Sequence, residues 1–166
     1  LVPGDEVVST SHVYSAARNA IRFACRRAGA RYVEVALPFE GAAPEDLVDR
    51  IARAMGPRCR LLVVDHIASE SALVFPLARI AALCRDRGVA VLADGAHSPG
   101  HVPLTLEELG VDYYAGNCHK WLCAAKGTAF LWVRRDRQRG VHPLVISHFL
   151  DQGFGAERSE EHTSEL

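Results

Sequence analysis

The sequence has 166 residues, of which 49% are hydrophobic and 23% are charged. These values are typical of one globular domain with a sizeable core. The formal net charge of -1 gives no reason to expect binding to nucleic acid or to a membrane surface. The sequence has no apolar run long enough to span a bilayer and no start that resembles a signal peptide, so we expect a cytoplasmic protein.

Short apolar strands alternate with amphipathic helices along the chain. This alternation predicts an α/β fold of three layers, with a mostly parallel sheet between helices. Thr105 and Glu108 have the spacing of a capping box, which predicts a short helix there. The predicted strands cover residues 7–8, 32–36, 61–65, 89–94, 112–116 and 128–133, and the predicted helices begin near residues 15, 44, 76 and 105.

Titratable side chains follow three of the predicted strands. His66 follows one strand, Asp94 and His97 come at the end of the next, and His119 and Lys120 follow the strand after that. The carboxyl ends of parallel strands meet at one edge of a sheet, and ligands bind at that edge in folds of this class. We therefore expect these side chains to contribute to one site.

Lysine is rare in this chain. Lys120 and Lys126 are its only lysines, and the remaining 17 of its 19 cationic side chains are arginines. Arginine stays protonated, whereas lysine can lose its proton and form an imine with a carbonyl compound. Two lysines within seven residues suggest a chemical requirement, with chance placement in an arginine-rich sequence as the alternative.

Two segments of this edge carry residue types suited to such chemistry. In Asp94-Gly-Ala-His97 a carboxylate ends a buried strand and needs a cationic partner, for which a protonated pyridine nitrogen is suitable. Lys120 lies beside Trp121, where it could form an imine, while Asn117 and His119 could hold a phosphate. Each segment taken alone is also compatible with a turn aspartate or a surface lysine.

Two other classes of function remain open. Asp94, His97 and His101 have carboxylate and imidazole groups at short spacing, and His66 or His119 could complete a metal site for hydrolysis. A non-catalytic α/β binding module would keep the same strands and helices without any reaction.

The segments Asp94-Gly-Ala-His97, Gly116-Asn-Cys-His119-Lys120-Trp121 and Lys126-Gly-Thr-Ala-Phe-Leu131 occur in this order. Together they resemble the class V aminotransferase family of pyridoxal-phosphate (PLP) enzymes, and in particular its isopenicillin N epimerase-like branch. The resemblance extends from Gly4 to about Gly155. It implies part of the large domain of a fold-type-I PLP enzyme, usually a homodimer, that acts on an amino acid or amine.

The resemblance also implies a role for individual residues. Lys120 would form the Schiff base with PLP, and Asp94 would pair with the ring nitrogen. By the same resemblance, His97 would contact the phenolic oxygen of PLP, and Asn117 and His119 would contact its phosphate. His12 would stack on the cofactor ring, and Ser69 would contact the cofactor or the substrate carboxylate.

The type of reaction stays open among epimerisation, transamination and desulfuration or another lyase reaction. The family places its substrate-binding arginine, and the cysteine of its desulfurases, beyond the matched region, and Cys118 and Cys123 do not occupy that position. We therefore expect residues 1–157 to be a partial PLP-binding domain with little activity alone. Residues 158–166 resemble a translated sequencing adapter, and we expect them to take no part in the fold.

Overall fold

Six strands form one sheet in the order β2-β1-β3-β4-β5-β6. Neighbouring strands from β2 to β5 pair in parallel, whereas β6 runs antiparallel to β5. The computed structural model that shows this describes residues 1–142. The strands are β1 (Glu6–Thr10), β2 (Arg31–Val35), β3 (Cys59–Asp65), β4 (Ala90–Gly95), β5 (Tyr113–Asn117) and β6 (Ala129–Val133).

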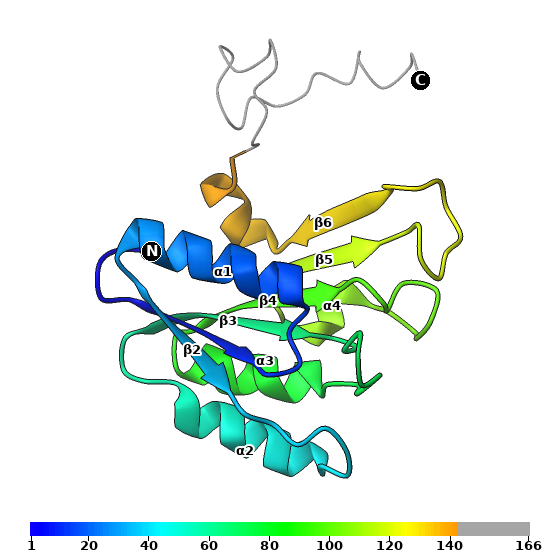
Figure 1. Cartoon of the computed structure of the whole chain (residues 1–166). Helices are drawn as coiled ribbons and strands as arrows, with labels where there is room; N and C mark the ends of the chain where they lie inside the picture. Colours follow the sequence, from blue (N-terminus) through cyan, green and yellow to red (C-terminus); the bar gives the residue numbers. More distant parts are fainter. Residues whose placement is uncertain (143–166) are drawn as a thin grey trace, which may run out of the picture. The chain divides into compact units, whose positions relative to one another are not determined.

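Helices cover both faces of the sheet, which confirms the predicted three-layer, mostly parallel architecture (Figure 1). One face packs against α1 (Ser15–Ala28), and the other against α2 (Pro44–Ala54) and α3 (Leu77–Asp86). The short helix α4 (Leu106–Leu109) lies next to α3.

The helix boundaries follow from local chemistry. Gly29 ends α1 in the left-handed conformation, with φ of 66°, where glycine has no side chain to clash. Pro44 is in the first turn of α2, where its missing N–H leaves no helical hydrogen bond unmade. The short helix predicted from Thr105 and Glu108 is present as α4, but the capping bond itself is not: the Thr105 side chain makes none, and the Glu108 N–H donates to the Thr105 carbonyl at 3.1 Å.

Alternating residues of each strand face opposite sides, so the core has two parts. The larger part lies between the sheet and helices α2 and α3 and contains Leu62, Ile80 and Tyr114, all fully buried. The smaller part faces α1 and contains Val7, Val63 and Cys25, and burial of such a side chain contributes about 1.5–3 kcal/mol. A Cβ atom at Gly95 would overlap the Tyr114 ring, so only glycine fits at the end of β4.

The chain divides into two units, Leu1–Val133 and Arg134–Leu166. Within the second unit the structure describes a 3₁₀ helix, η1 (Arg135–Gly140), before which Arg134 donates two hydrogen bonds to Asp136. In residues 1–142, no helix has the length and apolar character needed to cross a membrane. The predicted boundary at residue 157 and the predicted foreign segment 158–166 lie outside the described residues.

Candidate functional site

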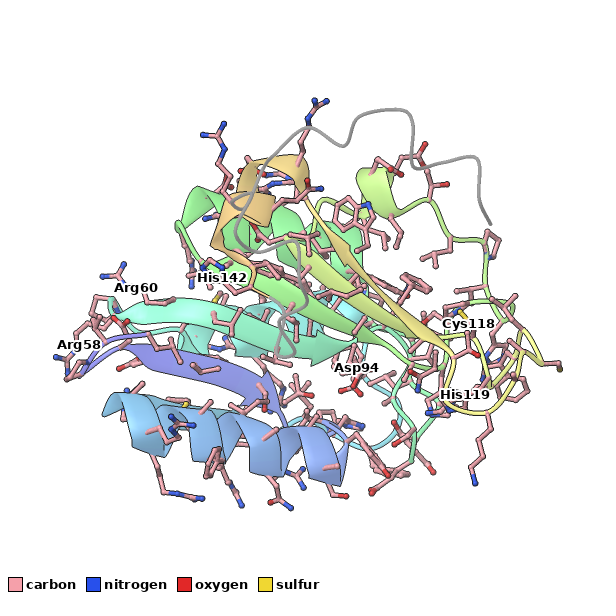
Figure 2. All side chains as sticks on the ribbon, turned by 90° about the horizontal axis from the view of Figure 1, so that it is seen from above. Arg58, Arg60, Asp94, Cys118, His119 and His142 are labelled. Atoms are coloured by element: carbon pink, nitrogen blue, oxygen red, sulfur yellow. The ribbon has the colours of Figure 1, made fainter. Side chains whose placement is uncertain are left out.

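The carboxyl ends of the parallel strands form the edge of the sheet at which the sequence predicted a site. Asp65 is the last residue of β3, Asp94 precedes the last residue of β4, and Asn117 ends β5. Figure 2 shows Asp94 and His119 toward one end of the sheet, with Arg58 at the opposite end. The fold therefore brings polar groups from three strands to one edge.

Lys120 lies in direct contact with His97, although 23 positions separate them in the sequence. The Lys120 Nζ atom is 3.0 Å from His97 Nε2, and the indole N–H of Trp121 donates to His97 Nδ1 at 3.3 Å. Because an indole N–H can only donate, Nδ1 must accept, and a neutral imidazole then carries its proton on Nε2. This tautomer can donate from Nε2 only to an uncharged Lys120 amine, whereas a Lys120 ammonium group must itself donate and would need Nε2 as its acceptor.

The environment of His97 disfavours its protonated form. Burial lowers the pKa of His97, and the positive charge of Lys120 lowers it further, while the negative charge of Asp94 opposes the change. His101 also lowers the pKa of His97, and its ring lies over that of Trp121, with 4.4 Å between ring centroids. His97 is thus kept as a neutral hydrogen-bonding group.

Asp65 and Asp94 are direct neighbours in the register of β3 and β4. Asp94 Oδ1 accepts a hydrogen bond from the Ala96 N–H at 3.0 Å, which orients its carboxylate at the strand end. Burial, followed by the charge of Asp94, raises the pKa of Asp65 from 3.8 to about 7. Two carboxyl groups therefore lie side by side at this part of the edge.

The loop that carries Lys120 connects two hydrogen-bonded antiparallel strands, with Asn117 opposite Ala129. The backbone N–H groups of Cys118 and His119 both donate to the Thr128 carbonyl, at 2.9 and 3.2 Å. His119 Nδ1 lies 3.0 Å from the same oxygen. These bonds fix the start of the loop, and with it the direction in which Lys120 leaves β5.

The loop after β4 packs closely against the Lys120 loop. At Gly100, with φ of 80°, an added Cβ atom would lie 2.9 Å from the backbone carbonyl of Trp121. A glycine is required here both by the positive φ and by this approach. The two loops that carry His97 and Lys120 are therefore held together by backbone packing as well as by side-chain contact.

His12 and Ser69 lie nearer to the β1 end of this edge. His12 is buried, with Nδ1 2.8 Å from Ser71 Oγ and Nε2 3.1 Å from the Pro38 carbonyl oxygen. Its ring stacks on Phe39. Ser69 is exposed, and within residues 1–142 neither His12 nor Ser69 makes a hydrogen bond to the Lys120 and His97 pair.

His66 takes part in a contact that the sequence analysis did not predict. Its Nδ1 lies 2.8 Å from the hydroxyl of Tyr114 in the core, and burial lowers the pKa of His66. Residue alternation on β5 places Tyr114 on the buried face, but the pairing of these two residues depends on strand order. Asp65 and Trp121 were also not predicted as site residues, although Asp65 ends a strand just as Asp94 does.

The predicted metal-site alternative finds no ligand set in the part of the chain that the structure describes. In residues 1–142 no group of three or more histidine, cysteine and acidic side chains is arranged to hold a metal ion. His101 contacts the Trp121 ring, and its Nδ1 lies 3.2 Å from the His97 carbonyl.

Comparison with known proteins gives consistent matches over this region. The profile of the family described as aminotransferase class-V matches residues 1–158. The chain is 37% identical over 163 residues to putative L-cysteine desulfhydrase 1 of Oryza sativa subsp. japonica, covering 93% of this chain and 34% of that protein. It is 36% identical over 148 residues to isopenicillin N epimerase of Amycolatopsis lactamdurans, covering 89% and 37%.

Solved structures agree with this match. A complex of the cystine C-S lyase C-DES with its product cysteine persulfide superimposes with a TM-score of 0.80 at 30% identity, covering 86% of this chain and 38% of that one. A lysine-to-alanine mutant of C-DES, with glycine covalently linked to its PLP cofactor, has a TM-score of 0.77 at 31% identity and the same coverage. The chain thus spans little more than a third of the length of these relatives.

Proposed function

The chain belongs to the aminotransferase class-V family of PLP-dependent enzymes, and on this basis we propose that it forms part of an enzyme that uses PLP to act on an amino acid or amine. In this proposal Lys120 is the residue that attaches the cofactor, and Asp94 is the partner of the cofactor's ring nitrogen. The observation that carries the proposal is the 3.0 Å contact between Lys120 Nζ and His97 Nε2 at the strand end that Asp94 occupies.

The residues at this edge fit the functional groups of PLP. An aldehyde requires a primary amine, which Lys120 has, and a protonated ring nitrogen requires a carboxylate, which Asp94 has. His97 presents a donor at Nε2 that suits the phenolic oxygen. We further propose phosphate contacts for Asn117 and His119, ring stacking for His12, and contact with the cofactor or substrate carboxylate for Ser69.

When bound, PLP supplies an electron sink that stabilises negative charge at the alpha carbon of the substrate. The protein's own part is to position groups and to move a proton. We propose that Lys120 Nζ removes the proton from the alpha carbon and returns it, as general base and then as general acid. His97 keeps its uncharged form beside Lys120 because burial and the charge of Lys120 lower the pKa of the imidazole.

The relatives differ in reaction, since they include desulfhydrases, an epimerase and a C-S lyase. We propose an amino acid substrate with chemistry at the alpha carbon as the step that these reactions share. We also propose that the whole protein is a homodimer, as the family resemblance implies, and that it is located in the cytoplasm. Light scattering on the purified protein tests the dimer.

Covalent trapping on the protein expressed from its full reading frame tests the proposal. PLP is added, the mixture is reduced with borohydride, and peptides are mapped by mass spectrometry. We expect the reduced pyridoxyl label on Lys120. Label on Lys126 instead, or none on either lysine, would refute the proposal.

The chain offers a matched control, because Lys126 is its only other lysine and lies in the same exposed loop. Lys120→Ala is expected to abolish the label, while Lys126→Ala is expected to retain it. Recording the absorption of bound PLP for each variant separates loss of attachment from loss of binding.

A further inference from the structure

Asp65 and Asp94 form a pair of carboxyl groups on one face of the sheet. They are aligned in the register of the parallel strands β3 and β4. Neighbouring strands are about 4.8 Å apart, and residues in register point to the same side. That side is the α1 side, because Val63 and Leu92, two positions earlier on each strand, belong to the core part that packs against α1.

One oxygen of the Asp65 carboxyl group lacks the partner that a buried carboxyl oxygen normally has. The relative exposure of Asp65 is 3%, and its Oδ2 atom is buried without a hydrogen-bond partner among the described residues. The positive charge of Arg18 on α1 acts to lower the pKa of Asp65, but the Arg18 side chain donates its hydrogen bonds to Glu34 and to the Ser11 carbonyl. Asp5, another buried aspartate, has Arg60 as its partner.

A buried carboxyl group with one oxygen unpartnered, beside a second carboxyl group, is costly to the fold. Burial and the charge of Asp94 raise the pKa of Asp65 to about 7, while Arg18 opposes this. A hydrophobic residue or an asparagine at this position would avoid the cost. The presence of a carboxyl group at this costly position therefore points to a positively charged ligand at this edge.

We propose that Asp65 is a positioning residue of the site, whose carboxylate acts with that of Asp94 to hold a positively charged heteroaromatic ring at the carboxyl edge of β3 and β4. This inference rests on the proposed function, in which that ring is the pyridine of PLP. Asp94 is the direct partner of the ring nitrogen, and Asp65 acts through Asp94 and through its own charge.

The coupling between the two carboxyl groups is reciprocal. The charge of Asp94 favours a proton on Asp65, so a cation placed against Asp94 favours loss of that proton. The ionised Asp65 in turn favours the protonated ring nitrogen. Asp65 thereby helps to keep the ring in the form that withdraws electrons most strongly.

The test uses PLP labelled with ¹⁵N in its ring, bound to the protein expressed from its full reading frame. The ¹⁵N chemical shift reports whether the ring nitrogen is protonated, and a pH titration gives its midpoint. We expect Asp65→Asn to lower the midpoint by about one pH unit or more, because one nearby negative charge is lost.

Asp5→Asn is the matched control, since it removes a buried carboxylate that lies just before the amino end of β1. It is expected to leave the ring-nitrogen titration unchanged. An equal midpoint in wild type and Asp65→Asn would overturn the inference and leave the proposed function intact. Failure of PLP to bind or to label Lys120 would overturn both.

A measurement on the wild type alone keeps the inference testable if Asp65→Asn does not fold. The carboxyl ¹³C signal of Asp65 is titrated with and without PLP. We expect bound PLP to shift the titration of Asp65 to lower pH, because the ring adds a positive charge beside the pair. An unchanged Asp65 titration in the PLP-bound protein would overturn the inference.

Discussion

The side-chain amine of Lys120 and the imidazole of His97 meet at 3.0 Å, and the charge of Lys120 lowers the pKa of His97. His97 is held in its neutral form by burial and by the adjacent positive charge. The contact thus places an uncharged hydrogen-bonding ring next to the amine that we propose as the reactive group. The effect of the Lys120 charge on the pKa of His97 can be measured separately from any reaction.

Replacement of Lys120 by methionine removes the positive charge but keeps a long side chain. We expect the pKa of His97 to rise toward its ordinary value of 6.5, because the second-largest cause of its lowering is lost. NMR titration of the imidazole in the absence of PLP measures this. Lys126→Met is the control and is expected to leave the His97 titration unchanged.

Trp121→Phe removes the N–H group that donates to His97 Nδ1. The ring is then free to carry its proton on either nitrogen, so we expect a mixture of tautomers in place of the Nε2–H form. Long-range ¹H–¹⁵N spectra of the imidazole distinguish the two forms. Trp132→Phe, on β6, is the control, and an unchanged single tautomer in Trp121→Phe would show that the indole does not set it.

The buried Asp65 makes the free energy of unfolding depend on pH. Its pKa is raised from 3.8 to about 7, so the folded protein binds this proton more tightly than the unfolded chain. The resulting contribution to stability is full below pH 3.8 and decreases as the pH rises to about 7. At 1.36 kcal/mol per pH unit the loss is at most roughly 4 kcal/mol.

Asp65→Asn is therefore expected to remove most of this decrease. Urea denaturation at intervals from pH 4 to pH 8 measures the slope, and the exposed Asp86→Asn serves as the control that keeps the wild-type slope. A slope in Asp65→Asn equal to that of the wild type would mean that another group causes the pH dependence.

Tyr114→Phe removes the hydroxyl that pairs with His66 Nδ1 at 2.8 Å. Both residues are buried, so the variant leaves an imidazole nitrogen without its partner, and we expect a loss of about 1–3 kcal/mol in the free energy of unfolding. Chemical denaturation measures the loss. Tyr113→Phe, on the opposite face of β5, is expected to change stability by less than about 0.5 kcal/mol.

The layer architecture could be predicted because local signals decide it. Helix α1 begins at the predicted residue, and it ends where Gly29 adopts the left-handed conformation that glycine favours. The antiparallel direction of β6 was not predicted, because alternation on the strand itself is the same in both directions. The absence of a helical pattern between β5 and β6 was the available signal, since a parallel neighbour would need a crossover. The capping bond from the Thr105 side chain was predicted but is absent, and the Glu108 N–H donates to the Thr105 backbone carbonyl instead.

The candidate site was predictable only where residues follow strand ends. Asp94, His97 and Lys120 were found in this way, and the sequence also placed them on one edge. The pairing of Asp65 with Asp94 requires the strand order, and the bond from Trp121 to His97 requires the packing of two loops. Such partners are set by tertiary structure and leave no periodic signal in the sequence.

The reversal of direction between β5 and β6 has a mechanical consequence. Both ends of the segment that carries Lys120 are held by the hydrogen bonds between β5 and β6, so the segment is fixed at two points. Its outer residues, from Leu122 to Gly127, are exposed, and the Ala124 N–H among them donates to the Cys118 carbonyl at 3.1 Å. The direction in which Lys120 leaves the sheet is therefore set where this segment joins β5 and β6, and not by its exposed outer part.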